Sequence, residues 1–110
     1  MTQPLVLDGT NYAYWKARMT AFLKSLDTRT WRAVRIGWTA PTINNGGVIT
    51  IKSEDDWTIE EQELALANDK AMNAIFNVVD LNVFKLINIC TEAKIAWDTL
   101  QTIYEGTFRV

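Results

Sequence analysis

The amino-acid sequence predicts an all-α protein, with about five helices in a compact bundle. Apolar residues recur at the spacing of a helix along most of the chain. Capping residues precede several of these apolar stripes, and glycines follow two of them. Apolar residues make up 48% of the 110 residues, so one domain can bury enough surface to fold without disulfides or metals. We therefore expect residues 1–110 to form a single domain.

The first two helices are expected over residues 11–26 and 30–36. Asp8, Thr10 and Asn11 offer capping side chains at the start of the first helix. A glycine directly after residue 36 is expected to end the second helix. The apolar residues assigned to the buried stripes of these helices are Tyr12, Trp15, Met19, Phe22, Leu23, Leu26, Trp31, Val34 and Trp38.

Residues 38–57 interrupt the helical pattern between the second and third helices. The β-prone residues 42–43 and 48–51 flank an Asn-Gly turn signal, which predicts a short two-stranded β-hairpin. Two strands alone are marginally stable in water, however, unless other residues pack on them. A surface loop is therefore an equal alternative for this segment.

The third helix, over residues 59–79, has the clearest start. Thr58 followed by Glu61 forms a capping-box pattern, in which each side chain accepts a hydrogen bond from the other residue's backbone N–H. Acidic residues in the first turn also complement the helix dipole. The expected buried face of this helix consists of Leu64, Ala67, Ala71, Ile75 and Val78.

The sequence after this helix predicts two more helices. Residues 83–90, "VFKLINIC", are almost wholly apolar, so this segment is expected to be the central and most buried helix. Thr91 is expected to cap a fifth helix that reaches Tyr104, and Gly106 follows where a left-handed residue commonly ends a helix. The buried stripe of the fifth helix is expected to contain Ala93, Trp97, Leu100, Ile103 and Tyr104.

Composition argues against an enzyme, a metal protein and a membrane protein. The chain has no histidine and one cysteine, so the usual general base and the commonest metal ligand are missing. Cys90 is interpreted as a small core residue. The sequence contains neither a phosphate-binding glycine loop nor an apolar run of roughly 20 residues. We expect a cytoplasmic protein with no catalytic residues, cofactor, metal, small-molecule substrate or membrane contact.

Charge is unevenly distributed along the chain, whose net charge is −2. Residues 1–38 carry six basic and two acidic side chains, whereas residues 39–64 carry one basic and six acidic side chains. Opposite patches of this kind steer neighbouring copies toward one another. The residues singled out as an assembly or nucleic-acid face are Arg29, Arg32, Arg35, Glu54, Asp55 and Asp56.

Each of these charged groups has two interpretations. Arginines spaced three apart, with aromatic residues nearby, bind phosphates and stack on bases, but a solvated helix face has the same pattern. Consecutive acidic residues before a helix can hold a metal, but they more commonly form a solvated face that complements the helix dipole. The sequence favours the solvated interpretation for both groups.

Five tryptophans are many for a chain of this length. Trp15 and Trp97 lie on regular helical stripes and are expected in the core, together with Trp31. Trp38 and Trp57 bracket the irregular segment, so they either fix its two ends to the rest of the protein or contact a partner.

Several blocks of sequence carry a resemblance to a known family. They are "LDGTNYAYWKARMTAFL" at 7–23, "WRAVRIGWTAP" at 31–41, "EDDWT" at 54–58, "KAMNAIFNVVDLNVFKLINICTEAKIAWDTL" at 70–100 and, overlapping the last of these, "AWDTLQTIYEG" at 96–106. In this order they resemble the N-terminal part of the Gag polyprotein of plant copia-type LTR retrotransposons, and the resemblance runs through most of the chain. It implies a capsid-lobe-like bundle, the N-terminal lobe of a longer Gag polypeptide.

The family resemblance also implies a function. Gag of such elements is a structural protein that self-associates into virus-like particles and packages the element's RNA. The implied partners are other Gag copies and RNA, the latter bound by the longer polypeptide and only weakly by these 110 residues. A Gag-derived module taken over by a host, which binds a peptide or RNA, is the alternative.

Overall fold

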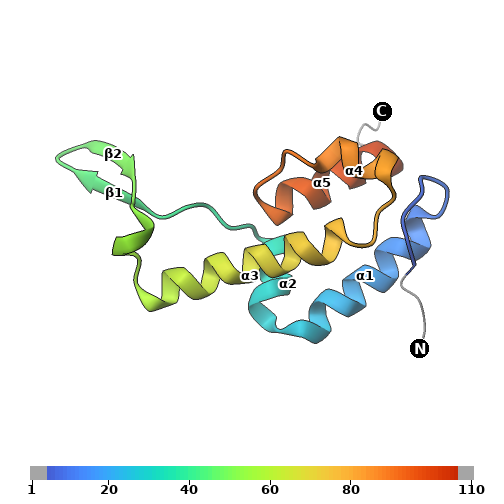
Figure 1. Cartoon of the computed structure of the whole chain (residues 1–110), viewed down its shortest axis with the longest axis horizontal. Coiled ribbons are helices and arrows are strands. Elements are labelled where there is room, and N and C mark those ends of the chain that lie inside the picture. Colours follow the sequence, from blue (N-terminus) through green and yellow to red (C-terminus); the bar gives the residue numbers. More distant parts are fainter. Residues whose placement is uncertain (1–4, 107–110) are drawn as a thin grey trace.

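The computed structural model describes residues 5–106, which form a helical body with a projecting β-hairpin (Figure 1). Within this range the chain has five α-helices, a two-stranded antiparallel sheet and a 3-10 turn. The mostly helical class is therefore confirmed, and the irregular segment contains a hairpin. The elements in chain order are α1 (Tyr12–Leu26), α2 (Thr28–Arg35), β1 (Thr42–Asn45), β2 (Val48–Ile51), η1 (Glu54–Asp56), α3 (Ile59–Phe76), α4 (Leu81–Ile87) and α5 (Ala93–Glu105).

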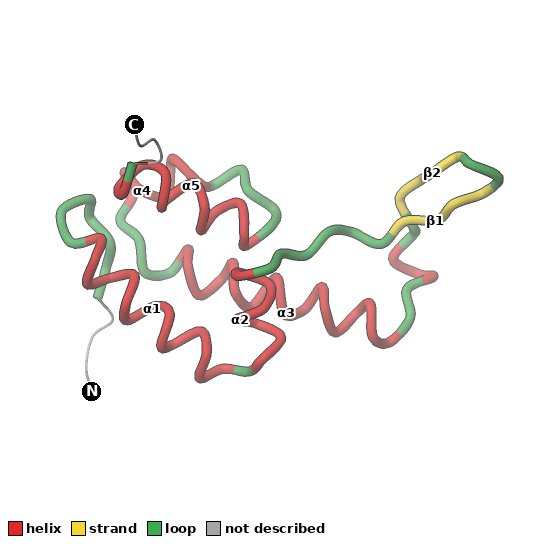
Figure 2. The backbone as a smooth tube through the Cα atoms, turned by 180° about the vertical axis from the view of Figure 1, so that it is seen from behind, coloured by secondary structure: helices red, strands yellow, loops and turns green. Residues whose placement is uncertain are grey.

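The longest helix, α3, runs from the base of the hairpin into the middle of the helical part (Figures 1 and 2). Helices α1, α2 and α5 all pack against α3, and α4 packs against α5. We call α1 to α5 the body and residues 38–57 the arm. Figure 2 shows the arm extending away from the body, and the molecule accordingly measures 50 × 40 × 24 Å.

Tryptophan side chains join the first, second and last helices in the core. Trp15 and Trp97 are 1% and 7% exposed, which confirms their prediction as core residues. Their ring centroids lie 5.7 Å apart, and Trp31 packs edge-on against Trp97 at 6.1 Å. Aromatic pairs at these distances contribute about 0.5–1.5 kcal/mol beyond the burial of their area. The core therefore depends on contacts between residues distant in the sequence.

A short N-terminal segment ties the start of the chain to the end of α3. Leu7 is fully buried and forms a parallel β-bridge with Val79. Leu7 N–H donates to Val78 O at 2.8 Å, and the indole Nε1–H of Trp15 donates to the same carbonyl oxygen at 3.0 Å. This bridge was not predicted, and it accounts for the end of α3 at Phe76 rather than at residue 79.

The helix starts agree with the sequence pattern only in part. The Thr58–Glu61 capping box is confirmed. Helix α2 was expected from residue 30, but it begins at Thr28 because Asp27 Oδ1 accepts from Thr30 N–H at 2.7 Å. The capping predictions for α1 and α5 were wrong, because neither helix has a side-chain cap from the expected residues. At α1, the Asn11 side chain instead donates to the backbone oxygen of Val6.

The prediction that residues 83–90 form the central helix was wrong. Helix α4 spans Leu81–Ile87, with Val83 and Ile87 buried, while Leu81 is exposed and Ile89, just after the helix, is 86% exposed. A short helix at the edge of the body has neighbours on one side, so apolar density alone does not predict its burial. The central helix is α3, whose small residues allow close packing.

Four residues assigned to buried helix stripes are exposed. Because neighbouring helices cover a narrower arc than the apolar stripe of each helix, the residues at the margins of the stripes remain in contact with solvent. The confirmed members of the α3 stripe are Ala67, Ala71 and Ile75. The exposed residues are Phe22 and Leu26 of α1, Leu64 of α3 and Ile103 of α5.

The hairpin turn is formed by two glycines. Gly46 and Gly47 have φ angles of 60° and 93°, and Asn45 pairs with Val48 on either side of them. A two-residue hairpin turn with positive φ at both positions follows the natural twist of the strands, and glycine adopts it without strain. Asn44 Oδ1 also accepts from Gly47 N–H at 2.9 Å. The turn therefore depends on local residues, as the sequence predicts.

Candidate functional site

The predicted arginine row lies on α2, next to the N-terminal half of α3. Arg29, Arg32 and Arg35 are all exposed. The row begins one residue after the helix start that Asp27 sets, and it ends where Gly37 leaves the helix with a φ of 110°. Helix packing places α2 beside α3, which carries Glu60 and Glu63 in its first turns. The structure therefore brings basic and acidic side chains together within one chain.

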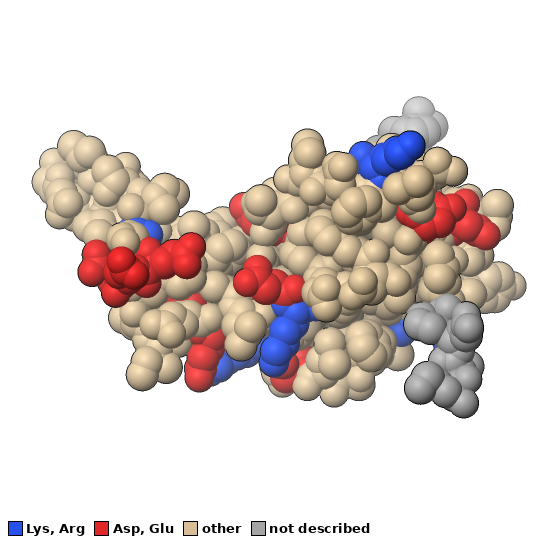
Figure 3. All heavy atoms as spheres, in the orientation of Figure 1, with Lys and Arg blue, Asp and Glu red and all other residues tan. Residues whose placement is uncertain are grey.

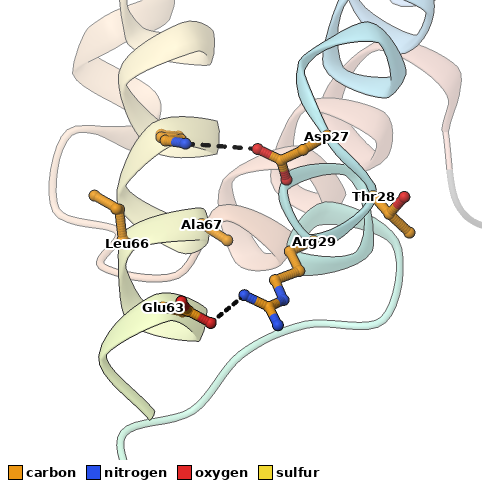
Figure 4. Close-up of a pocket in the computed structure, with 7 residues that line it drawn as sticks. Asp27, Thr28, Arg29, Glu63, Leu66 and Ala67 are labelled. Atoms are coloured by element: carbon orange, nitrogen blue, oxygen red, sulfur yellow. Dashed lines mark hydrogen bonds and ion pairs between the residues drawn. The ribbon is translucent and has the colours of Figure 1, made fainter. Parts of the chain in front are cut away.

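Two ion pairs connect α2 to α3 across a surface hollow (Figure 4). Arg29 of α2 points to Glu63 of α3 and forms an ion pair with it. On the same side, Lys70 Nζ lies 3.6 Å from Asp27 Oδ2. All four side chains are at least a third exposed, so each pair contributes roughly 0–1 kcal/mol to stability. The charges in this hollow are therefore compensated within the chain.

Asp27 has a second role in addition to its contact with Lys70. The hydrogen bond from Thr30 N–H to its carboxylate is the main reason that the pKa of Asp27 is lowered, and Lys70 lowers it further. A carboxylate that accepts backbone N–H bonds at a helix start is stabilised in its charged form. Asp27 is thus accounted for as a capping residue.

A second hollow brings one predicted aromatic residue to the arginine row. Trp38 is half-buried, and with Arg29, Arg32, Leu64 and Glu60 it lines this hollow. Arg32 and Trp38 therefore present a guanidinium and an indole on one surface, which is the combination that stacks on bases or aromatic side chains. Glu60 adds a negative charge at the same place, which opposes the binding of a phosphate.

The acidic residues Glu54, Asp55 and Asp56 lie elsewhere. They form η1 at the base of the hairpin, and their side chains are exposed. Figure 3 shows acidic side chains gathered below the hairpin. Ser53 Oγ accepts from Asp55 N–H at 3.4 Å and begins this turn. The structure thus separates this acidic group from the basic row of the same chain.

Trp57 lies at the other end of the arm. It is half-buried, and it precedes Thr58 and the capping box that begins α3. Lys52 Nζ lies 2.8 Å from Glu61 Oε1, and this contact is the main reason that the pKa of Glu61 is lowered. Backbone hydrogen bonding from Thr58 lowers it further. These contacts connect the arm to α3, while Trp38 and Trp57 lie at its two ends.

Residues 5–106 hold one cysteine thiol and a set of carboxylates. No group of three or more histidine, cysteine, aspartate or glutamate side chains in this range is arranged to hold a metal ion. Burial raises the pKa of the Cys90 thiol, which lowers its reactivity. Within the same part of the chain, no helix is long and apolar enough to cross a membrane.

Asn68 is a structural residue that sequence reasoning missed. It is 1% exposed on α3, where its Oδ1 accepts from Ala93 N–H at 2.8 Å and its Nδ2 donates to Thr91 O at 2.9 Å. The first N–H groups of α5 have no partner within the helix, so Asn68 acts as its cap from another helix. The available signal was its spacing, because Asn68 lies three residues before Ala71 and seven before Ile75, in line with the predicted buried stripe.

Comparison of the chain with models of protein families, with curated proteins and with solved structures found no match. The sequence blocks and the geometry of the described residues therefore carry the functional argument. The geometry separates three surfaces: the compensated hollow between α2 and α3, the neighbouring surface of Arg32 and Trp38, and the arm with its acidic base. The last two are the candidates for contact with partners.

Proposed function

We propose that this chain is a structural Gag domain of a copia-type LTR retrotransposon, the N-terminal lobe of a capsid-forming polypeptide. The longer polypeptide self-associates in the cytoplasm into virus-like particles that package the element's RNA. Its partners are other Gag copies and RNA. In this proposal the chain is not an enzyme, and it needs no cofactor.

The observation that carries this proposal is that residues of the Gag-like blocks form the aromatic contacts between the first and last helices. Tyr12 stacks on Tyr104 with ring centroids 5.5 Å apart, and Trp15 packs on Trp97 at 5.7 Å. Gly9, with a φ of 95°, lies under Tyr104, whose Oη would be 3.6 Å from a Cβ at this position. The first and last blocks therefore recognise each other. The residues of these blocks are used for packing within the chain, and this supports a structural role.

Surface charge supports self-association through two regions of the molecule. Arg29 is already paired with Glu63 of its own chain, which leaves Arg32 and Arg35 as the arginines for a contact between copies. We propose that they meet the acidic η1 residues of a neighbouring copy. A contact between two different patches is heterologous, so it closes into rings or propagates as an assembly requires.

The test is particle formation by a longer polypeptide that contains these 110 residues. Electron microscopy and light scattering should show particles with RNA, while the isolated chain remains monomeric or weakly associated at micromolar concentration, since shells depend on many weak contacts. Replacement of Arg32 and Arg35 by glutamate should block particles without changing the melting temperature. Arg18→Glu, an exposed basic residue on α1, is the matched control and should leave particles intact. Normal particles from the double variant would contradict the proposed contact.

The surface of Arg32 and Trp38 favours one alternative, a host-domesticated module that binds RNA or a peptide. Few basic residues cluster here, and Glu60 lies among them, so we expect RNA binding by the isolated chain to be weak and lost at physiological salt. Filter binding across a salt series measures this. Sub-micromolar affinity at physiological salt that Trp38→Ala abolishes would favour the alternative over the capsid lobe.

A further inference from the structure

The free edge of β2 presents the backbone groups of its two isoleucines. Lys52 N–H donates to Pro41 O at 2.9 Å. Together with the strand register, this bond shows which residues of β2 are hydrogen-bonded to β1. Backbone groups in an antiparallel pair point alternately toward the partner strand and away from it. Even-numbered residues of β2 therefore bond to β1, whereas the N–H and C=O groups of Ile49 and Ile51 point outward.

β2 lacks the features that protect exposed strand edges. Natural edges commonly carry lysine, other charges, proline or a bulge, whereas β2 consists of Val-Ile-Thr-Ile. Ile49 and Ile51 are 65% and 71% exposed, and both project from the same side of the strand. Residues 36–51 include no charged side chain. By contrast, β1 follows Pro41 and ends in two asparagines. The edge of β2 is therefore the one suited to pairing with another strand.

We propose that β2 pairs in an antiparallel direction with β2 of a second copy of this chain. The two-fold axis passes beside Thr50, so that Thr50 faces its counterpart and Ile49 faces Ile51 of the second copy. In this register each outward N–H meets an outward C=O of the other copy. The isoleucines of both copies form one apolar face on a four-stranded sheet. A sheet of this size is more stable than a lone two-stranded hairpin. The partner strand is recognised by self-complementarity.

Charge selects this direction of pairing. The acidic η1 residues 54–56 begin three residues after the end of β2, so two parallel β2 strands would place both acidic groups side by side. In the antiparallel register, each acidic group lies beside the uncharged glycine turn of the other copy. Like charges in close contact are unfavourable, whereas this arrangement keeps the two groups at opposite ends of the joined sheet.

This inference rests on the proposed function, because it names one interface of the self-associating protein. The pairing is isologous, with the same strand from both copies, and it closes on itself as a dimer. The heterologous contact of Arg32 and Arg35 then links dimers to one another. A shell built in this way has an isologous contact within each dimer and a heterologous contact between dimers.

Disulfide trapping of the 110-residue chain tests the register. In a Cys90→Ala background, Thr50→Cys places the two thiols on facing residues whose Cα atoms are about 4.5 Å apart, which suits a disulfide. Val48→Cys is the matched control, since it lies on the same face of the same strand. In the proposed register its counterpart is about 14 Å away along the sheet, which is too far for a bond.

Oxidation should give disulfide-linked dimer from Thr50→Cys at least about tenfold faster than from Val48→Cys. Equal rates, or no dimer from Thr50→Cys, would overturn the proposal. A second measurement uses sedimentation equilibrium of the chain with an intact Thr50. Ile49→Pro removes an outward N–H and should weaken dimerisation about tenfold. Thr42→Pro removes an outward N–H from β1 and should leave dimerisation unchanged; equal effects of the two prolines would overturn the choice of edge.

The two proposals fail in different experiments. Particles from the longer polypeptide that persist with Ile49→Pro, together with no trapping by Thr50→Cys, would overturn the strand pairing and leave the capsid function standing. Selective trapping by Thr50→Cys, with no particles from the longer polypeptide under any condition, would overturn the capsid function and leave the dimer standing.

Discussion

The body and the arm of this protein are both rich in apolar residues, but they use them in opposite ways. In the body, Trp15 and Leu23 are almost completely buried by residues from distant parts of the chain. In the arm, Val48, Ile49 and Ile51 are mostly exposed, and the hairpin is held by pairing between adjacent strands and by its glycine turn. The buried contacts that stabilise this chain therefore lie mainly in the body, whereas the arm leaves its apolar side chains exposed. Each prediction below tests that division.

The largest effect is expected from a change at the centre of the body. Trp97→Ala removes an indole that contacts both Trp15 and Trp31, and it should lower the free energy of unfolding by about 3–5 kcal/mol. Chemical denaturation followed by far-UV circular dichroism measures the loss. Trp97→Phe should cost clearly less. A loss below about 1 kcal/mol for the alanine variant would contradict the assignment of this core.

A smaller loss is expected at the buried cap of α5. Asn68→Ala leaves the backbone N–H of Ala93 and the carbonyl of Thr91 without their partner, which should cost about 1–3 kcal/mol. Asn73→Ala, on the exposed side of the same helix, is the matched control and should change stability by less than about 0.5 kcal/mol. Equal losses from the two variants would show that α5 does not depend on this cap.

The junction between the arm and the body should respond at an intermediate level. Thr58→Ala breaks the capping box at the start of α3 and should cost about 1 kcal/mol. Hydrogen exchange should accelerate most at the first turn of α3 and not at the core residues of α5. Uniform acceleration along the whole chain would indicate that the cap supports global folding and not only this junction.

The surface ion pair between α2 and α3 should contribute little. A double-mutant cycle of Arg29→Ala and Glu63→Ala should give a coupling energy below about 1 kcal/mol, because both side chains are half exposed. The coupling should decrease further as salt is added. A coupling energy several times larger would mean that ion pairs between α2 and α3 stabilise the fold. An effect of Arg32→Glu on particles could then result from lost stability and not from a lost contact between copies.

The smallest effect is expected in the arm. Ile51→Thr keeps a β-branched residue at a position that is 71% exposed, so the free energy of unfolding of the monomer should change by less than about 0.5 kcal/mol. Thermal unfolding at low protein concentration measures this. A loss comparable to that of Thr58→Ala would show that the arm packs on the body, against the division made above.

Local signals in the sequence predicted much of the fold. The capping box at Thr58, the turn at Gly46 and the burial of Trp15 and Trp97 all follow from patterns of a few residues, and the structure confirms them. The margins of the same helix stripes were predicted less well. The failures concern contacts over long distances in the sequence. Neither the bridge of Leu7 with Val79 nor the cap by Asn68 has a local pattern, and the exposure of α4 depends on which helices happen to surround it.

The candidate site shows the same limit. Charge counts identified the arginine row and the acidic η1 group, but they could not predict that Arg29 pairs with Glu63 of its own chain. Spacing within one helix places the arginines relative to each other, whereas their neighbours depend on how α2 packs on α3. The outward-facing backbone groups of β2 could not be identified from the sequence either. Backbone groups alternate along a strand, so the observed strand register decides which of them face outward.

The contact between Trp15 and Trp97 has a consequence for synthesis of the protein. Helix α1 packs mainly on α2 and also on α3, but Tyr12 and Trp15 find their aromatic partners only in α5. A chain that is still being translated therefore leaves this part of the α1 stripe uncovered until almost all of the body has left the ribosome. The hairpin pairs only neighbouring residues and forms on the microsecond timescale once it emerges, although two strands alone are marginally stable. A truncated product that lacks α5 therefore has an incomplete core in the body and a poorly supported arm, and it becomes a substrate for chaperones and proteases.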